Sequence, residues 1–139
     1  MNIREFEYPS DLQQTQSLWR SIEKGVSLGP SDTPEEIKKK LLRDPELFLV
    51  AEEDGEIVGT VIGGFDGRRG LIYHLAVSAS YRRRGIGSQL MKEIEARLCA
   101  KGCIRCYLLV TTDNPEAMKY YRDLGWTQMD YVVNFGKNL

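Results

Sequence analysis

The chain has 139 residues and a formal net charge of −1, and 42% of its residues are hydrophobic and 28% charged. This length suits one compact domain and is short for two, so we predict a single domain over residues 1–139. The balanced charge excludes a nucleic-acid footprint spread over the whole chain. The first segment, MNIREFEYPSDLQ, is no secretory signal, and no apolar run is long enough to span a bilayer. We therefore expect a cytoplasmic protein with no membrane and no nucleic-acid partner.

The N-terminal part predicts one strand and two helices. Apolar residues around Ile3 indicate a short strand. Ser10 can cap a helix that runs to about Glu23. Thr33 begins a capping box for a second helix that stops before Pro45.

The middle of the chain predicts three strands. Leu47–Glu52 and Glu56–Ile62 are β-prone and are joined by Asp54-Gly55, a dipeptide suited to a tight antiparallel hairpin. A glycine-rich corner is expected next, formed by Gly63, Gly64, Gly67 and Gly70. The run Leu71–Val77 is almost continuously apolar, which predicts a central strand buried on both faces.

The C-terminal half predicts alternating helices and strands. We expect a helix over Gly85–Ala100, a buried strand over Ile104–Val110, a helix over Asn114–Leu124 and a last strand within Trp126–Phe135. The element order is then βααβββαβαβ, an α/β (α+β) fold with about four helices. A right-handed crossover from Leu71–Val77 to Ile104–Val110 makes these two strands a central parallel pair in a mostly antiparallel sheet.

A basic turn between strand and helix is the most informative segment. Arg82-Arg83-Arg84-Gly85-Ile86-Gly87-Ser88 follows the strand ending at Val77 and opens the next helix. Free amides at a helix start bind phosphate, glycines let the backbone approach the anion, and arginines add charge-assisted hydrogen bonds. Leu90 stands where a dinucleotide fingerprint needs a third glycine, and the Gly-Lys-Ser/Thr ending of a P-loop is absent. The alternative is that the arginines form a solvated turn.

These residues resemble the GNAT (Gcn5-related N-acetyltransferase) superfamily. Its signature Arg/Gln-x-x-Gly-x-Gly/Ala is matched by Arg82-x-x-Gly85-x-Gly87, and its Asn-x-x-Ala-x-x-x-Tyr-x-x-x-Gly-Phe helix is similar to Asn114–Trp126. The hairpin Phe48–Gly59 also resembles the family's second and third strands. In detail the chain is most similar to small bacterial YpeA-like acetyltransferases.

The resemblance implies that acetyl-coenzyme A is the co-substrate, with its pyrophosphate on the helix-start amides and its pantetheine along the preceding strand. The implied contacts are Leu75, Ala76, Val77, Arg82, Arg83, Arg84, Gly85, Ile86, Gly87, Ser88, Asn114 and Tyr121. Two features depart from the family pattern. Ala79 replaces a common proline, and Leu71–Val77 lacks the carboxylate that several members use as general base.

The resemblance implies transfer of an acetyl group to a primary amine by direct attack on the thioester. Tyr121 is the predicted acid for the departing thiolate, and a backbone amide near Leu75 or Ala76 is the predicted oxyanion donor. Tyr121 and its neighbour Tyr120 are otherwise ordinary core aromatics.

The general base has several candidates. His74 lies on the cofactor strand, but alternation points it away from the face of Leu75 and Val77 unless a bulge intervenes. Tyr73, on the other face, lines the acceptor pocket or simply packs. A distant Glu acting through water is a further alternative, and so is the absence of a base.

The remaining features bear on partners. The acceptor is a small molecule or a protein amine, which the sequence does not distinguish, and the alternative to an enzyme is a non-catalytic acyl-coenzyme A sensor. Cys103-Ile-Arg-Cys106 has the spacing of redox and zinc sites, but a second pair is missing and His74 is remote, so we expect no metal. An exposed edge at Trp126–Phe135 would allow a homodimer.

Overall fold

The structure is a computed structural model that describes residues 1–139. The chain divides into two compact units, Met1–Leu109 and Val110–Leu139, which we describe separately. The expectation of one domain over residues 1–139 stays a prediction.

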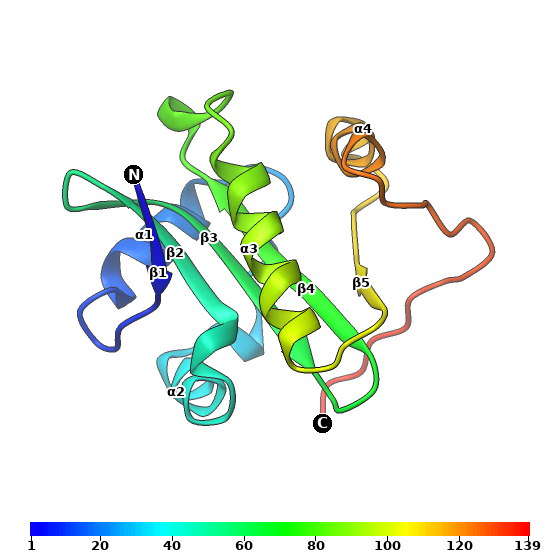
Figure 1. The fold of residues 1–139 in the computed structure, drawn as a ribbon, viewed down its shortest axis with the longest axis horizontal. Helices are drawn as coiled ribbons and strands as arrows, with labels where there is room; N and C mark the ends of the chain where they lie inside the picture. Colours follow the sequence, from blue (N-terminus) through cyan, green and yellow to red (C-terminus); the bar gives the residue numbers. More distant parts are fainter. The chain divides into compact units, whose positions relative to one another are not determined.

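The first unit is built on a five-stranded sheet (Figure 1). Its strands lie side by side in chain order: β1 (Asn2–Glu5), β2 (Phe48–Glu53), β3 (Glu56–Phe65), β4 (Gly70–Val77) and β5 (Cys106–Leu108). The first four strands pair antiparallel, and β4 and β5 pair parallel. The predicted mixed, mostly antiparallel fold is therefore confirmed, although the parallel pair lies at the edge of the sheet.

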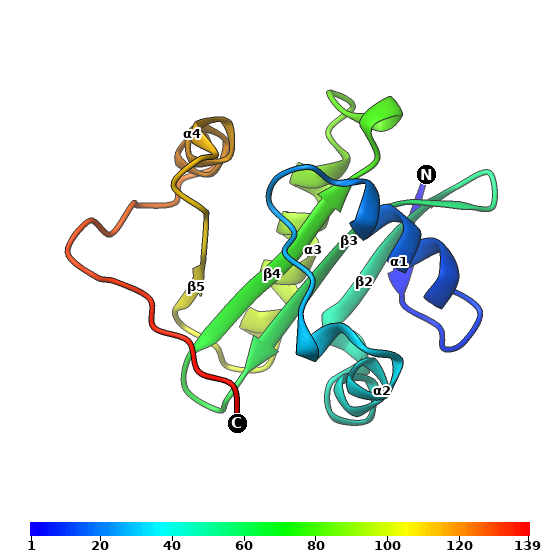
Figure 2. The same cartoon turned by 180° about the vertical axis from the view of Figure 1, so that it is seen from behind.

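Helices cover both faces of this sheet. The first unit contains α1 (Leu12–Ser21), α2 (Pro34–Arg43) and α3 (Ile86–Ala100), and the second contains α4 (Pro115–Asp123). The long helix α3 lies on one face of the sheet (Figure 1), and α1 lies on the opposite face (Figure 2). The predicted four helices are confirmed.

Of the two predicted helix caps, Thr33 is confirmed and Ser10 is wrong. The Thr33 hydroxyl accepts a hydrogen bond from the Glu36 amide at 3.3 Å, so the predicted cap of α2 is present. Ser10 does not cap α1, because its hydroxyl donates to the Glu7 carbonyl at 3.4 Å and the helix begins after Asp11.

Glycines shape the hairpins on either side of β3. Asp54 and Gly55 have φ values of 50° and 80°, as the predicted tight turn requires. Gly63 lies within β3 and not in a corner: a Cβ added there would meet Ile94 of α3 at 3.0 Å. Gly59 is similarly close to Leu90, so these glycines let α3 pack directly on the sheet.

Buried apolar side chains fill both interfaces of the sheet. On the α1 side, Trp19 and Phe48 stack with ring centroids 6.0 Å apart, and Phe48 also stacks on Phe6 at 4.4 Å. On the other side, the inward face of α3 is fully buried. That face consists of Ile86, Leu90, Met91, Ile94 and Leu98.

Strand β5 is shorter than predicted, and β4 is more exposed than predicted. Leu71 of β4 is 40% exposed, whereas its neighbour Ile72 on the opposite face of the strand is buried. The expected strand Ile104–Val110 was too long, since Ile104 is 96% exposed and lies outside β5. The prediction that β4 is buried on both faces is therefore wrong.

The predicted last strand is absent. Helix α4 ends at Asp123, Gly125 takes a φ of 94°, and Trp126–Phe135 contains no strand. A β-prone segment forms a strand only where another strand completes its hydrogen bonds, and the second unit contains none. The strand edge on which the homodimer expectation rested is therefore missing.

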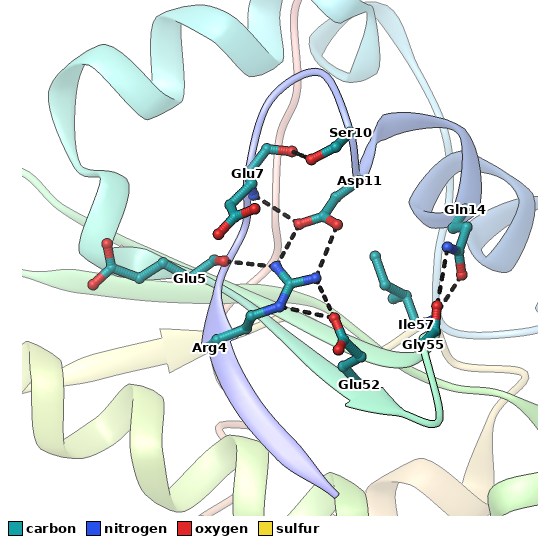
Figure 3. A network of polar contacts seen from close by, with 9 residues as sticks. All are labelled: Arg4, Glu5, Glu7, Ser10, Asp11, Gln14, Glu52, Gly55 and Ile57. Carbon is teal, nitrogen blue, oxygen red and sulfur yellow. Dashed lines mark hydrogen bonds and ion pairs between the residues drawn. The ribbon is translucent and has the colours of Figure 1, made fainter.

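A polar network ties the start of α1 to three strands (Figure 3). The Arg4 guanidinium donates to both carboxylate oxygens of Asp11, at 2.6 and 3.0 Å, and to Glu52. The Glu7 amide also donates to Asp11, at 2.7 Å. Three residues after Asp11, the side chain of Gln14 accepts from the Ile57 amide at 2.8 Å. These contacts fix α1 against β1, β2 and β3.

We expect Asp11→Asn to lower the free energy of unfolding at pH 7 by about 2 kcal/mol, since charged hydrogen bonds are lost from a buried site. Burial alone raises the pKa of Asp11, but hydrogen bonds from Arg4 and the Glu7 amide outweigh it and lower that pKa below its ordinary value. The stabilisation is thus complete above the unfolded pKa of about 4 and disappears as pH falls through the lower folded value. Urea unfolding of both proteins from pH 7 to pH 2.5 should show the difference shrinking in acid. Asp123→Asn, at an exposed ion pair with Lys119, is the control and should change little.

Candidate active site

A bulge interrupts β4 halfway along the strand. Thr60 of β3 lies opposite Ala76, whereas Ile62 lies opposite Tyr73, so two residues of β4 oppose one of β3. One of these two residues, His74, has a φ of 52°, a left-handed conformation that is rare for a residue with a side chain. The bulge breaks the alternation of side chains at His74. From the sequence, His74 could be a candidate base only if such a bulge were present.

Two buried side chains hold the bulge in place. The Thr60 hydroxyl donates to the His74 carbonyl at 2.9 Å and accepts a hydrogen bond from the Trp19 indole, also at 2.9 Å. Trp19 is 1% exposed and Thr60 is fully buried. The left-handed backbone of His74 is therefore anchored to α1 through a single hydroxyl group.

Thr60→Val should lower the free energy of unfolding by about 2–3 kcal/mol, because it leaves a buried indole N–H and a carbonyl without their partner. Chemical denaturation measures this change. The matched control is Thr15→Val, because the Thr15 hydroxyl is also buried but has no hydrogen-bond partner. That variant should keep or gain stability, and equal losses at the two sites would contradict the role given to Thr60.

The ladder between β4 and β5 stops early. It pairs Gly70 with Cys106, Leu71 with Tyr107 and Ile72 with Leu108. Strand β4 continues to Val77, so its carboxyl half runs on without a β5 partner. Beyond Ile72, the backbone groups on this side of β4 therefore have no hydrogen-bond partner in β5.

The turn after β4 leads directly into α3. Arg83 and Gly85 have positive φ values, 63° and 78°, and α3 begins at Ile86. A Cβ added at Gly85 would meet nothing within 4 Å, so the space beside this residue is open. The first amides of a helix have no acceptor within it and carry the positive end of its dipole. This turn fits an anion such as a pyrophosphate.

Two of the three arginines have defined contacts within the turn. Arg82 donates to the Val77 carbonyl at 3.3 Å, and the Arg84 guanidinium lies 4.8 Å from the centre of the Tyr81 ring. Ala79, which replaces the family's common proline, begins a short 3₁₀ helix, Ala79–Tyr81. The Tyr81 amide donates to the Ser78 carbonyl at 2.9 Å there, so hydrogen bonding orders the turn without the proline.

The second unit carries the other two predicted site residues. Asn114 caps α4, because its side-chain oxygen accepts from the Ala117 amide at 3.2 Å. Tyr121 is half-buried and packs edge to face on Tyr120 and Trp126, at 5.3 and 6.3 Å. Burial, with a smaller contribution from Tyr120, raises the pKa of Tyr121 to about 12. The phenol is therefore protonated at neutral pH, and the cofactor roles of Asn114 and Tyr121 stay predictions.

An acidic residue that the sequence did not single out lies against the bulge. The Nε2 atom of His74 is 2.7 Å from Oδ1 of Asp32, which ends the short 3₁₀ helix Pro30–Asp32 between α1 and α2. The neighbouring phenol, Tyr73, has its pKa raised by burial and then by the charges of Asp32 and Asp44. Asp32 belongs to no motif, and only the tertiary fold brings it beside β4.

The cysteines have the environment of structural thiols. Cys103 is buried, and burial raises the pKa of the half-buried Cys106 to about 11, which keeps it protonated and unreactive at neutral pH. No group of three or more His, Cys, Asp and Glu side chains is placed to hold a metal ion. None of the helices combines the length and apolarity needed to cross a bilayer.

A mixed sheet with a bulged strand, an opened parallel ladder and a glycine turn at a helix start defines an acetyltransferase fold. The chain belongs to the acetyltransferase (GNAT) family, whose sequence profile matches residues 12–126. It is 41% identical over 140 aligned residues to an acetyltransferase of Sodalis glossinidius, covering 100% of this chain and 96% of that protein. An acetyltransferase of Pectobacterium atrosepticum has the same identity and coverage. The chain is accordingly an acetyltransferase.

Solved structures support the same fold. The aminoglycoside 6'-N-acetyltransferase of Acinetobacter haemolyticus superimposes with a TM-score of 0.79 at 20% identity, covering 100% of this chain and 99% of that one. The N-acetylglutamate synthase of Neisseria gonorrhoeae, solved with coenzyme A and N-acetyl-glutamate, gives a TM-score of 0.70 at 22% identity. That match covers 86% of this chain and 27% of the synthase. At these identities the likeness concerns the fold alone.

Proposed function

We propose that this acetyltransferase uses acetyl-coenzyme A as donor and a primary amine as acceptor. The proposal rests on three structural features that occur in order along β4 and into the start of α3. The β4 bulge, the early end of the β4–β5 ladder and the open turn at Gly85 follow one another from Tyr73 to Ile86. An extended molecule with a pyrophosphate at one end and amides along its length has the polarity that this stretch can satisfy.

The turn binds the phosphates in this proposal. Backbone amides from Arg83 to Ser88 donate to the pyrophosphate, and Arg82 to Arg84 add positive charge around it. The amides of the pantetheine arm hydrogen-bond to Leu75–Val77, the part of β4 without a β5 partner. The thioester is then placed at the bulge, near the amides of Leu75 and Ala76.

The chemistry needs three services from the protein. A backbone amide of Leu75 or Ala76 donates to the oxyanion that forms when the amine attacks the thioester carbonyl. Tyr121 gives a proton to the departing thiolate, a role for which a pKa of about 12 keeps the phenol supplied with its proton. The third service is removal of a proton from the acceptor ammonium.

A thiol-release assay with a panel of amines tests the proposal. The panel contains free amino acids, polyamines, aminoglycosides and peptides with a free N-terminus, and mass spectrometry of the product locates the acetyl group. We expect at least one class to release coenzyme A together with an acetylated amine. Tight binding of acetyl-coenzyme A with no turnover on any amine would instead identify a sensor.

A further inference from the structure

The imidazole of His74 occupies an enclosed position on the α1 side of the sheet. Its ring packs edge to face on Trp19, with centroids 4.8 Å apart, and on Tyr73 at 5.4 Å, and its side chain is 12% exposed. The backbone that carries this ring is fixed by the Thr60 hydroxyl through the His74 carbonyl. The ring therefore has little freedom, although a part of it is accessible.

Asp32 determines which imidazole nitrogen is basic. One carboxylate oxygen of Asp32 lies 2.7 Å from Nε2 of His74, and the other accepts from the Gly29 amide at 2.9 Å. An ionised carboxylate only accepts hydrogen bonds, so Nε2 carries the proton of the neutral ring. Nδ1 is then the atom with a free electron pair, ready to accept a proton.

We propose that Nδ1 of His74 accepts the proton of the acceptor ammonium, and that Asp32 is the positioning residue that orients the imidazole for this step. The inference rests on the proposed function, because it uses the thioester position at the bulge. His74 directly precedes Leu75, the predicted oxyanion donor, so the base and the oxyanion donor belong to adjacent residues of one bulge.

The proton balance is complete. His74 takes one proton from the ammonium, and the neutral amine forms a C–N bond to the thioester carbonyl. The tetrahedral adduct then collapses with cleavage of the C–S bond, and Tyr121 gives its proton to the departing thiolate. The second amine proton leaves to solvent, and the Tyr121 phenolate regains a proton from solvent. The products are an amide, free coenzyme A thiol and an imidazolium, which loses its proton to water.

The charges around the ring favour this role. Asp32 is the carboxylate that contacts the imidazole, and Tyr73 is the neighbouring phenol, with a raised pKa that keeps it neutral. Asp44 is close enough to affect Tyr73 but is paired with Lys40 at 3.3 Å and with Lys101 at 3.6 Å. From α1 the ring contacts Trp19, and from β3 the Thr60 hydroxyl contacts the His74 carbonyl; neither of these side chains titrates. Asp32 is therefore the charged side chain in direct contact with the ring.

The chain offers a direct measurement, because His74 is its only histidine. A single imidazole proton resonance in NMR gives the pKa of His74 in the free wild-type enzyme. We expect the acidic limb of kcat/KM against pH to have the same midpoint, since that limb reports the base of the free enzyme. Midpoints that differ by more than about 0.5 unit would overturn the proposal.

Variants provide a second test. His74→Gln keeps an N–H donor for Asp32 but cannot accept a proton, and we expect kcat/KM at pH 7 to fall by about 10²-fold with loss of the acidic limb. His74→Asn should behave alike and suits the left-handed backbone better. Asp32→Asn keeps a hydrogen-bonding side chain but removes the carboxylate that fixes the imidazole tautomer, so we expect kcat/KM to fall while the midpoint of its acidic limb still coincides with the NMR midpoint of His74 in that variant. A purely structural pair would change the melting temperature and kcat, and the midpoint of the acidic limb would not follow the His74 resonance.

Failure of the inference is distinguishable from failure of the proposed function. If the wild type binds acetyl-coenzyme A in calorimetry but acetylates no amine, the proposed enzyme function is wrong, and the assignment of His74 as its base is wrong too. If the wild type acetylates an amine and His74→Gln and His74→Asn both keep its pH profile within twofold, only the base assignment is wrong.

Discussion

Gly85→Glu should weaken the binding of coenzyme A by at least about 100-fold, a loss of roughly 3 kcal/mol. The substitution puts a carboxylate at the helix start where the pyrophosphate is proposed to bind, and like charges in contact cost several kcal/mol. It also forces a side chain into a backbone with a φ of 78°, at a cost of about 1–2 kcal/mol. The added Cβ itself meets nothing within 4 Å, so a steric clash with the protein is not the cause. Isothermal calorimetry with coenzyme A measures the change.

The same helix supplies a matched control at its other end. Gly102 follows α3, has a φ of 93°, and also leaves open space around an added Cβ. Gly102→Glu therefore imposes a comparable backbone strain at a site far along the chain from the turn. We expect it to melt at a lower temperature, as Gly85→Glu does, yet to bind coenzyme A like the wild type. Equal binding by Gly85→Glu and the wild type would place the phosphates elsewhere.

Tyr121→Phe should lower kcat by roughly 10²-fold and leave the affinity for coenzyme A nearly unchanged, as expected for the loss of a general acid. The pKa of about 12 adds a second expectation. Because the phenol stays protonated far above neutral pH, kcat of the wild type should show no alkaline decline from Tyr121 below about pH 10. Steady-state kinetics from pH 6 to pH 10 tests both statements.

Tyr120→Phe is the internal comparison for this prediction. Adjacent residues of a helix point about 100° apart, so Tyr120 and Tyr121 cannot both face the sulfur. Each variant removes one hydroxyl from the same helix and leaves the aromatic ring in place. A large loss of kcat for Tyr120→Phe, or full turnover by both variants with a competent amine, would contradict the assignment of Tyr121.

Local chemistry determined much of this fold. The Asp54-Gly55 turn, the Thr33 cap and the glycine turn at Gly85 lie where their sequences predict them, because each depends on backbone conformation and hydrogen bonds within a few residues. The strand–helix–strand segment correctly predicted the parallel pairing of β4 and β5, because a helix that connects two neighbouring strands returns the chain to run in the same direction. The wrong predictions concern partners remote in sequence. Trp126–Phe135 is β-prone, but a strand needs a neighbour, and the sequence cannot tell whether one is available.

The candidate site shows the same division between sequence and tertiary structure. By itself the sequence determined the glycine turn at the start of α3, and it predicts an anion site there because glycines and arginines next to a helix start are a local anion-binding arrangement. Only the tertiary structure decided the orientation of His74, since a bulge is a mismatch between two strands and not a property of either. Folding also brought Trp19 to Thr60 and Asp32 to His74, contacts that join residues about 40 positions apart in the chain. Such pairs leave no periodic or motif signal, because a hydrogen bond depends on distance in space and not on spacing in sequence.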